Sequence, residues 1–228
     1  MEKIQAIVLA AGRGERLKAG LPKAFIKFNK KPLLVYSLQT FSKSKRISSI
    51  ILTVPKTYLL EAKKIINFYG LNKVKAIIAG GRQRSDSVLN AVRVLDKDTE
   101  FVLIHDSARA FVSKDLISSV IGALRDNPAI IPVIDLVDTI KHVDGRGTVR
   151  TTMDRKYLKA VQTPQGFKRK IIDKYFKKTT GCLYDDSMFV EKKVKVKTIR
   201  GEVYNVKITS PSDLKLAKYI FRKHKINS

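Results

Sequence analysis

Short apolar segments alternate with helical segments along the first 135 residues, and this alternation constrains the fold more than any other feature. The expected strands are rich in Ile, Val and Leu and end at turn residues: 4–11, 47–54, 74–80, 100–106 and 129–134. The expected helices lie between them: 32–43, 58–70, 85–95 and 113–127. Because parallel strands need crossover connections, the alternation predicts an α/β fold with a doubly wound, mostly parallel sheet.

The rhythm changes after Ile134. Residues 138–155 alternate apolar and polar side chains around Asp-Gly-Arg-Gly at 144–147, a pattern that predicts a β-hairpin. This hairpin holds too few bulky apolar residues to bury itself. We therefore expect a protruding arm at about 136–158 that packs either on its own domain or on a second copy of the chain.

The rest of the chain continues without a linker, so that residues 1–228 are expected to form one domain with the arm attached. Helices are expected near 171–178 and 186–192, followed by a strand over 194–201. Pro211, after Ser210, marks the first turn of a terminal helix.

Composition narrows the classes of protein that are possible. No apolar run approaches the roughly 18 residues of a membrane span, and Cys182 is the only cysteine, so we expect a cytoplasmic protein. The formal net charge is +26, from 46 basic and 20 acidic residues. Because the basic residues are scattered, they favour anionic small-molecule substrates over a nucleic-acid footprint, although a basic nucleic-acid-binding protein remains an alternative.

Ligands of doubly wound sheets bind beyond the carboxyl ends of the strands, and the first such loop is AAGRGERLKAGLPK at residues 10–23. Leu17 stands where a dinucleotide-binding loop has its third glycine, and no Gly-Lys-Ser/Thr follows. Small residues let the backbone approach a ligand, and Arg13, Arg16 and Lys23 supply positive charge. The loop therefore predicts a cradle for phosphates.

Two later loops also follow expected strands. In GGRQRSDSV, at residues 80–88, Ser85 or Ser87 is suited either to capping a helix or to contacting a base edge. In HDSAR, at residues 105–109, Asp106 ends a buried strand, where it is suited to hold Mg²⁺ or to cap the next turn. We assign His105 no catalytic role.

Taken together, these motifs resemble those of the 2-C-methyl-D-erythritol 4-phosphate cytidylyltransferase family, Rossmann-like nucleotidyltransferases of the non-mevalonate isoprenoid pathway. The first loop resembles L-A-A-G-x-G-x-R-[LM]…P-K, and the next two resemble G-G-x-x-R-x-x-S-V and H-D-[AG]-A-R-P. The motifs DTIK, TMDR, VQTPQGF, YDDSMFVE and NVKITSPSDL follow in order, so the resemblance covers nearly the whole chain. It implies transfer of a cytidylyl group from CTP to a sugar-alcohol phosphate, with Mg²⁺ or another divalent cation.

The resemblance also assigns site residues, in three groups. The catalytic cations that face the phosphates are Arg16, Lys23 and Lys207. The residues expected around CTP are Ala10, Ala11, Gly12, Gly81 and Ser87. The residues of the acceptor site are Asp106, Arg109, Thr139, Arg155 and Thr163. Asp106 is also the implied metal ligand, and the two arm residues are implied to enter the site of a second subunit, which makes the protein a homodimer.

Some positions depart from the family pattern: Arg82, Ala110, Tyr184 and Tyr204. The tyrosine before Asn205 also resembles the related enzymes that make CDP-ribitol. Ribitol-5-phosphate, or another pentitol phosphate, is therefore the alternative acceptor.

Overall fold

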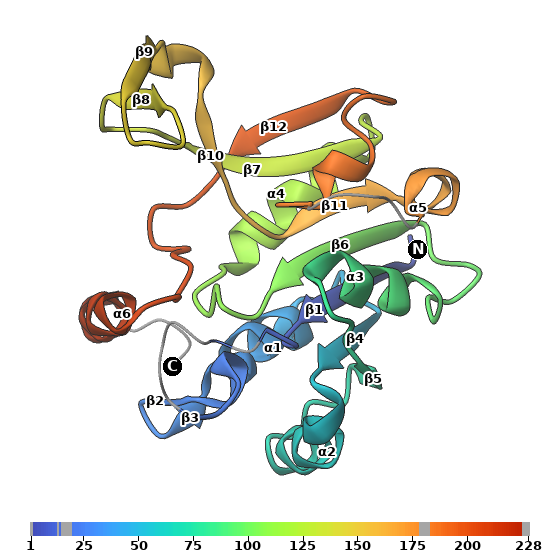
Figure 1. The fold of residues 1–228 in the computed structure, drawn as a ribbon. Helices are drawn as coiled ribbons and strands as arrows, with labels where there is room; N and C mark the ends of the chain where they lie inside the picture. The colour runs from blue at the N-terminus through green and yellow to red at the C-terminus, as the bar shows by residue number, and fades with distance from the viewer. Residues whose placement is uncertain (1, 13, 15–19, 178–182, 225–228) are drawn as a thin grey trace.

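The computed structural model describes residues 2–12, 14, 20–177 and 183–224. Within these residues one eight-stranded sheet has helices on both of its faces (Figure 1). Its strands are β1 (Ile4–Leu9), β4 (Ser49–Val54), β5 (Val74–Ala79), β6 (Phe101–Asp106), β7 (Ala129–Asp135), β10 (Lys159–Val161), β11 (Gln165–Lys168) and β12 (Val196–Arg200). Strands β6, β1, β4 and β5 are parallel neighbours, which confirms the predicted mostly parallel, doubly wound sheet.

Strands β10 and β11 were not predicted. They run antiparallel beside β7, and β11 also pairs with β6, so they lie between the two parallel parts of the sheet. Strand β12 pairs in parallel with the other side of β7. The sequences Lys-Ala-Val and Gln-Gly-Phe-Lys are too short to show a period-2 pattern, which is why sequence reasoning missed them.

The predicted helices of the first 135 residues are confirmed. They are α1 (Leu33–Lys43), α2 (Leu59–Phe68), α3 (Arg84–Val92) and α4 (Lys114–Leu124). Helix α5 (Arg169–Tyr175) begins two residues before the expected start, and α6 (Pro211–His224) is the predicted terminal helix. The helix expected at 186–192 is wrong, because only the 3₁₀ turn η5 (Ser187–Phe189) forms there. The backbone N–H groups at its start donate to the side chain of Gln165.

Alternation along the buried strands divides the core between the two faces. In β1, Ile4, Ala6 and Val8 belong to the cluster that includes residues of α1, α2 and α4. Ile7 and Leu9 belong to the cluster that includes residues of α3 and α5. Each large apolar side chain buried in this way contributes about 1.5–3 kcal/mol. The two clusters hold the strands in register, so the carboxyl ends of β1 and β6 are fixed side by side.

A third apolar cluster attaches α6 and the segment before it. Ile208 is buried with Phe28, Ala110 and Phe111, and its N–H donates to the carbonyl of Ala108 at 2.9 Å. Small ordered elements belong to the same region: η2 (Lys23–Phe25), β2 (Lys27–Phe28) and β3 (Lys31–Pro32). This packing places the residues just before Ile208 beside the end of β6.

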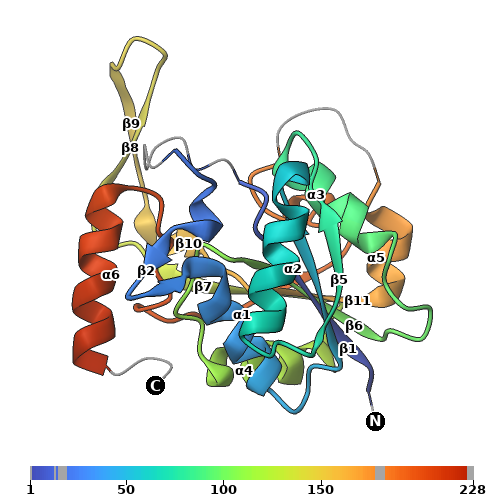
Figure 2. The ribbon, with the colours of Figure 1, turned by 90° about the horizontal axis from the view of Figure 1, so that it is seen from below.

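The predicted hairpin is confirmed as β8 (Ile140–Val143) and β9 (Val149–Met153), which project away from the sheet (Figure 2). Every residue of β9 is exposed. The exposed large apolar residues in and beside the arm are Val137, Val143, Val149, Met153 and Tyr157. The arm therefore does not bury itself on its own chain. No helix in the described part of the chain is long and apolar enough to cross a membrane.

Candidate functional site

A cleft of about 250 Å³ opens at the carboxyl ends of β1 and β6. Nine of the residues singled out in the sequence line it: Ala10, Ala11, Gly12, Lys23, Gly81, Arg82, Ser87, Asp106 and Lys207. Arg109 and Thr163 do not line the cleft, and Thr139 and Arg155 are exposed on and beside the arm. Arg16 lies outside the described residues. The structure thus brings together loops that are up to two hundred residues apart in the chain.

The first loop exposes backbone to the cleft and positions a lysine. A Cβ added at Gly12 would meet no atom within 4 Å, so the backbone there is open to a ligand. Gly14 has φ +70°, and an added Cβ would lie 2.7 Å from the Cβ of Lys23. Only glycine combines that conformation with such a close approach. This contact brings Lys23 against the glycine-rich loop at the cleft.

The second loop is held by its own side chains. The hydroxyl of Ser87 accepts a hydrogen bond from the N–H of Gly81 at 3.0 Å and donates to the carbonyl of Gln83 at 3.3 Å. Gln83 and Asp86 form the capping box of α3. A Cβ at Gly81 would lie 2.1 Å from that of Asp86, so this position requires glycine. Ser87 therefore shapes the loop rather than capping the helix.

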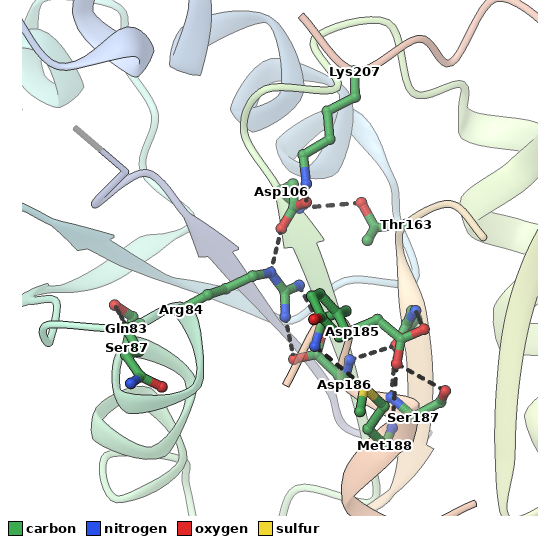
Figure 3. A network of polar contacts seen from close by, with 12 residues as sticks. Gln83, Arg84, Ser87, Asp106, Thr163, Asp185, Asp186, Ser187, Met188 and Lys207 are labelled. Atoms are coloured by element: carbon green, nitrogen blue, oxygen red, sulfur yellow. Dashed lines mark hydrogen bonds and ion pairs between the residues drawn. The ribbon is translucent and has the colours of Figure 1, made fainter. Parts of the chain in front are cut away.

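Asp106 belongs to a chain of ion pairs that runs from the cleft into the core (Figure 3). Its Oδ2 lies 2.7 Å from Nζ of Lys207, and its Oδ1 lies 2.9 Å from Nε of Arg84. The two terminal nitrogens of Arg84 bind both oxygens of Asp186, at 2.6 and 2.7 Å. Asp186 is fully buried, whereas the side chain of Lys207 is 41% exposed. Two carboxylates and two cations thus alternate from the core to the cleft.

Burial and these partners set the charges. Burial opposes ionisation of Asp106, but Arg84 and Lys207 outweigh it and hold the pKa of Asp106 far below its usual range. Although burial alone would lower the pKa of Arg84, Asp186 and Asp106 raise it. Burial raises the pKa of Asp186, while the two hydrogen bonds from Arg84 act in the opposite direction. The carboxylate that faces the cleft is therefore ionised at neutral pH.

A hydrogen-bond chain behind the cleft fixes the backbone of Asp106. Its N–H donates to Oγ1 of Thr163 at 3.1 Å, and that oxygen lies 3.0 Å from Nδ1 of His105. Nε2 of His105 lies 3.1 Å from the carbonyl of Arg109. Burial lowers the pKa of His105 to about 4, so the ring is neutral at pH 7. The geometry assigns the proton to Nε2, which donates to that carbonyl, while Nδ1 accepts from the hydroxyl of Thr163.

Arg109 braces the loop that carries Lys207. Its guanidinium donates to the carbonyls of Asn205 at 2.7 Å and Val161 at 3.0 Å. The amide of Asn205 donates to the carbonyl of Thr163 at 2.8 Å. Arg109, expected near the acceptor phosphate, therefore lies behind the cleft and ties two segments of its wall together.

A metal ion would find one carboxylate in this cleft. In the part of the chain that the structure describes, no three His, Cys, Asp or Glu side chains gather as a metal site. Asp106 is the only acidic residue among the described ones that line the cleft. One carboxylate fits Mg²⁺, because this ion keeps water and substrate phosphate oxygens as most of its ligands. The donor set thus suits a metal that arrives with a polyphosphate.

Sequence reasoning gave no role to Arg84 and Asp186, although both lie in motifs that resemble the family. The signal available was the charge of Arg84 at the start of a predicted amphipathic helix, where a cation opposes the helix dipole.

Four positions depart from the family pattern. Arg82 is exposed at the cleft, and Ala110 is buried in the third apolar cluster. Tyr184 and Tyr204 are 82% and 46% exposed.

Comparisons with known proteins agree on one family. The family model described as IspD, 2-C-methyl-D-erythritol 4-phosphate cytidylyltransferase, matches residues 4–223. The enzyme of that name from Syntrophus aciditrophicus is 37% identical over 226 residues, which cover 97% of each chain. The enzyme from Frankia casuarinae is 39% identical over 95% of this chain and 80% of its own. The crystal structure of 4-diphosphocytidyl-2C-methyl-D-erythritol synthase from Anaerococcus prevotii superimposes with a TM-score of 0.84 at 32% identity, covering 97% of this chain and 99% of its own.

Replacing Asp106 by Asn should cost the fold more at pH 7 than at pH 3. The pKa of Asp106 in the folded protein lies below its unfolded value of about 3.9. The ionised carboxylate therefore stabilises the fold fully at neutral pH, and this stabilisation is lost progressively as the pH falls below the unfolded pKa toward the folded one. From pH 7 to pH 3 we expect the difference in free energy of unfolding between parent and Asp106→Asn to shrink by about 1 kcal/mol. Urea unfolding at both pH values measures it, and a difference that stays constant or grows on acidification contradicts the assigned charge.

Proposed function

This chain belongs to the 2-C-methyl-D-erythritol 4-phosphate cytidylyltransferase family, and we propose that the cleft at the ends of β1 and β6 is the place where it joins CTP to that acceptor. The products are 4-diphosphocytidyl-2-C-methyl-D-erythritol, an isoprenoid precursor, and pyrophosphate. The observation that most supports this proposal is the Lys207–Asp106 ion pair. It holds a half-exposed cation in the cleft that the glycine-rich loop lines, and such a loop suits phosphates.

The reaction requires charge neutralisation rather than proton abstraction. A phosphate monoester is mostly ionised at pH 7, so its oxygen attacks the α-phosphorus of CTP directly. The bond from the α-phosphorus to the bridging oxygen breaks, and pyrophosphate leaves with that electron pair. Bringing one anion onto another is the difficulty, and fixed cations reduce it. The buried, hydrogen-bonded ring of His105 has no part in such a step.

Lysines stand on two sides of the cleft. Lys23 follows the first loop and is proposed to bind the triphosphate, together with Arg16, which belongs to the same loop. Lys207 approaches from the segment before α6 and is proposed to bind the reacting phosphates. Because the side chain of Lys207 is 41% exposed, it can exchange its contact with Asp106 for a phosphate oxygen.

The cytidine is proposed to lie against the backbone of the two glycine loops. Ala10, Ala11 and Gly12 offer small side chains and open backbone on one side. Gly81, held by Ser87, offers the same on the other side. Backbone N–H and carbonyl groups that face a base can recognise it without long side chains.

We propose Mg²⁺ as the cofactor, with Asp106 as its protein ligand. When bound, the ion would neutralise charge on the phosphates of CTP, including the pyrophosphate that leaves. The protein supplies one hard carboxylate oxygen, and the partners of Asp106 hold this oxygen in place.

Since CTP is made inside cells, we propose that the enzyme acts in the cytoplasm.

The arm is proposed to complete the acceptor site of a second subunit, in a homodimer. Thr139 and Arg155 are exposed at its base, and the guanidinium of Arg155 donates to the carbonyl of Val137. The apolar residues of the arm are exposed in the single chain. Their burial against a partner subunit would therefore stabilise a dimer. A closed, two-fold pair in which each arm reaches the other cleft satisfies both requirements.

The family match favours methylerythritol phosphate over ribitol 5-phosphate as the acceptor. It also disfavours a nucleic-acid-binding protein, because relatives that are 37% and 39% identical over nearly the whole chain carry the name of the cytidylyltransferase. The net charge of +26 then serves to attract two polyanionic substrates.

Removal of either lysine of the cleft should stop chemistry while the fold persists. We expect Lys23→Ala and Lys207→Ala each to lower kcat about 10²–10³-fold, because each removes a cation that meets charge developing in the transition state. Pyrophosphate release with CTP, Mg²⁺ and methylerythritol phosphate measures it. Lys215→Ala, an exposed lysine of α6, is the matched control and should stay within about twofold. A kcat near the parent value in a cleft variant removes that lysine from the mechanism.

Mixing two inactive variants should restore activity if the arm is exchanged. In a dimer of Lys23→Ala with Arg155→Ala, one cleft carries both defects and the other has neither. After subunit exchange, half of the dimers are mixed, so we expect about one quarter of parental activity. The control mixture, Lys23→Ala with Lys207→Ala, leaves a defect in every cleft and should stay inactive. Recovery in neither mixture indicates that the arm serves its own chain.

A further inference from the structure

Arg84 divides its guanidinium unequally between two carboxylates. Its two terminal nitrogens bind both oxygens of Asp186, at 2.6 and 2.7 Å, and only Nε is left for Oδ1 of Asp106, at 2.9 Å. Such paired contacts fix the plane of a guanidinium as well as its position. Because that plane is fixed by Asp186, the direction of the single contact to Asp106 is fixed too (Figure 3).

The anchor of this arrangement is itself immobilised. Asp186 is fully buried and does not line the cleft. Its backbone N–H donates to Oε1 of Gln165 at 3.1 Å, and the same oxygen accepts from the N–H of Ser187 at 3.0 Å. Gln165 belongs to β11, in the middle of the sheet. The sheet therefore holds Asp186, Asp186 holds Arg84, and Arg84 holds Asp106.

Arg84 also joins this chain of contacts to the nucleotide side of the cleft. It is the first residue of α3 and directly follows the loop of Gly81 and Gln83. That loop is held to α3 by Ser87 and by the capping box. A shift of the loop would thus move the guanidinium that fixes Asp106.

Lys207 can leave Asp106 only if another cation remains. A buried carboxylate that loses its last partner is strongly destabilised. When Lys207 turns to a phosphate, the contact of Arg84 with Oδ1 stays, and Oδ2 becomes open toward the cleft. Arg84 shares its single positive charge between Asp106 and Asp186, and Asp186 has no exposed surface.

We propose that Arg84 is a positioning residue of the reaction, held by Asp186, and that it occupies Oδ1 of Asp106 so that Oδ2 faces the magnesium ion that arrives with the phosphates of CTP. The inference rests on the proposed magnesium–CTP site. It assigns Asp186 an effect on turnover although this side chain touches neither substrate. It also leaves only Oδ2 of Asp106 to hold a metal ion, because Oδ1 contacts Arg84.

The decisive variants are Arg84→Lys and Asp186→Asn. Lysine keeps the charge but cannot bind two carboxylates in a fixed plane, and Asn keeps the shape of Asp186 but loses one accepting oxygen. We expect each to lower kcat about 10–100-fold, as the loss of an outer partner of a metal ligand does, and KM for CTP to rise by up to about tenfold, because part of the affinity for CTP comes from the metal. Arg93→Gln, exposed directly after the same helix, and Asp173→Asn, in a surface ion pair, are the matched controls.

A second readout does not depend on turnover. Calorimetric titration of CTP without acceptor, with and without Mg²⁺, gives the gain in CTP affinity that the metal provides. We expect this gain in the parent and in both controls, and about a tenfold smaller gain in Arg84→Lys and Asp186→Asn. The affinity measured without Mg²⁺ should stay close to the parental value, because the cytidine contacts are untouched.

The possible outcomes separate two failures. If the parent shows no gain with Mg²⁺, the proposed metal site is wrong. If the parent shows it and Arg84→Lys keeps both the gain and a kcat within twofold, the positioning role is wrong. Should Asp186→Asn fail to fold, the double variant Arg84→Gln/Asp186→Asn replaces the charged pair by a neutral one. A parental magnesium-dependent gain in that folded variant also overturns the proposal.

Discussion

Placing the carboxylate of Asp106 at the buried end of β6 obliges the chain to bring cations to it. Without partners such a group would either protonate or destabilise the fold, and two cations, Arg84 and Lys207, prevent both. They come from the start of α3 and from the segment before α6, so the pairing joins three distant parts of the chain. The same ionised carboxylate is what a hard metal requires.

The segment from β10 to β11 is the hub that makes this convergence possible. Its side chains face three different loops, and each loop delivers one part of the site. Gln162 accepts from the backbone of Glu202, Thr163 accepts from the backbone of Asp106, and Gln165 accepts from the backbone of Asp186. Strand β11, which begins at Gln165, is paired with β6 and β7, so it gives this segment a rigid support from which the three polar side chains fix the loops of the cleft.

Local patterns in the sequence were sufficient for the parallel half of the sheet, the helices that cover it and the hairpin. These elements repeat a period over enough residues to be recognised, and the loops after β1 and β6 carry the cleft by the geometry of parallel strands. What local patterns do not contain is pairing over long distances. Arg84 and Asp186 are 102 residues apart, and nothing in either neighbourhood indicates the other. The helix predicted at 186–192 does not form either, and Asp186 there also makes long-range contacts, with Arg84 and with Gln165.

We propose that this cleft joins CTP to a methylerythritol phosphate and that the acceptor is selected between the cleft of one subunit and the arm of another. Pyrophosphate release by the purified protein, with CTP and Mg²⁺ and with either methylerythritol 4-phosphate or ribitol 5-phosphate, tests this most directly. We expect a kcat/KM at least about 100-fold higher for methylerythritol 4-phosphate than for ribitol 5-phosphate. A site that hydrogen-bonds the hydroxyl groups of one acceptor strongly rejects an acceptor whose hydroxyl groups do not match it. Equal or preferred use of ribitol 5-phosphate, or no pyrophosphate with either acceptor, would contradict it.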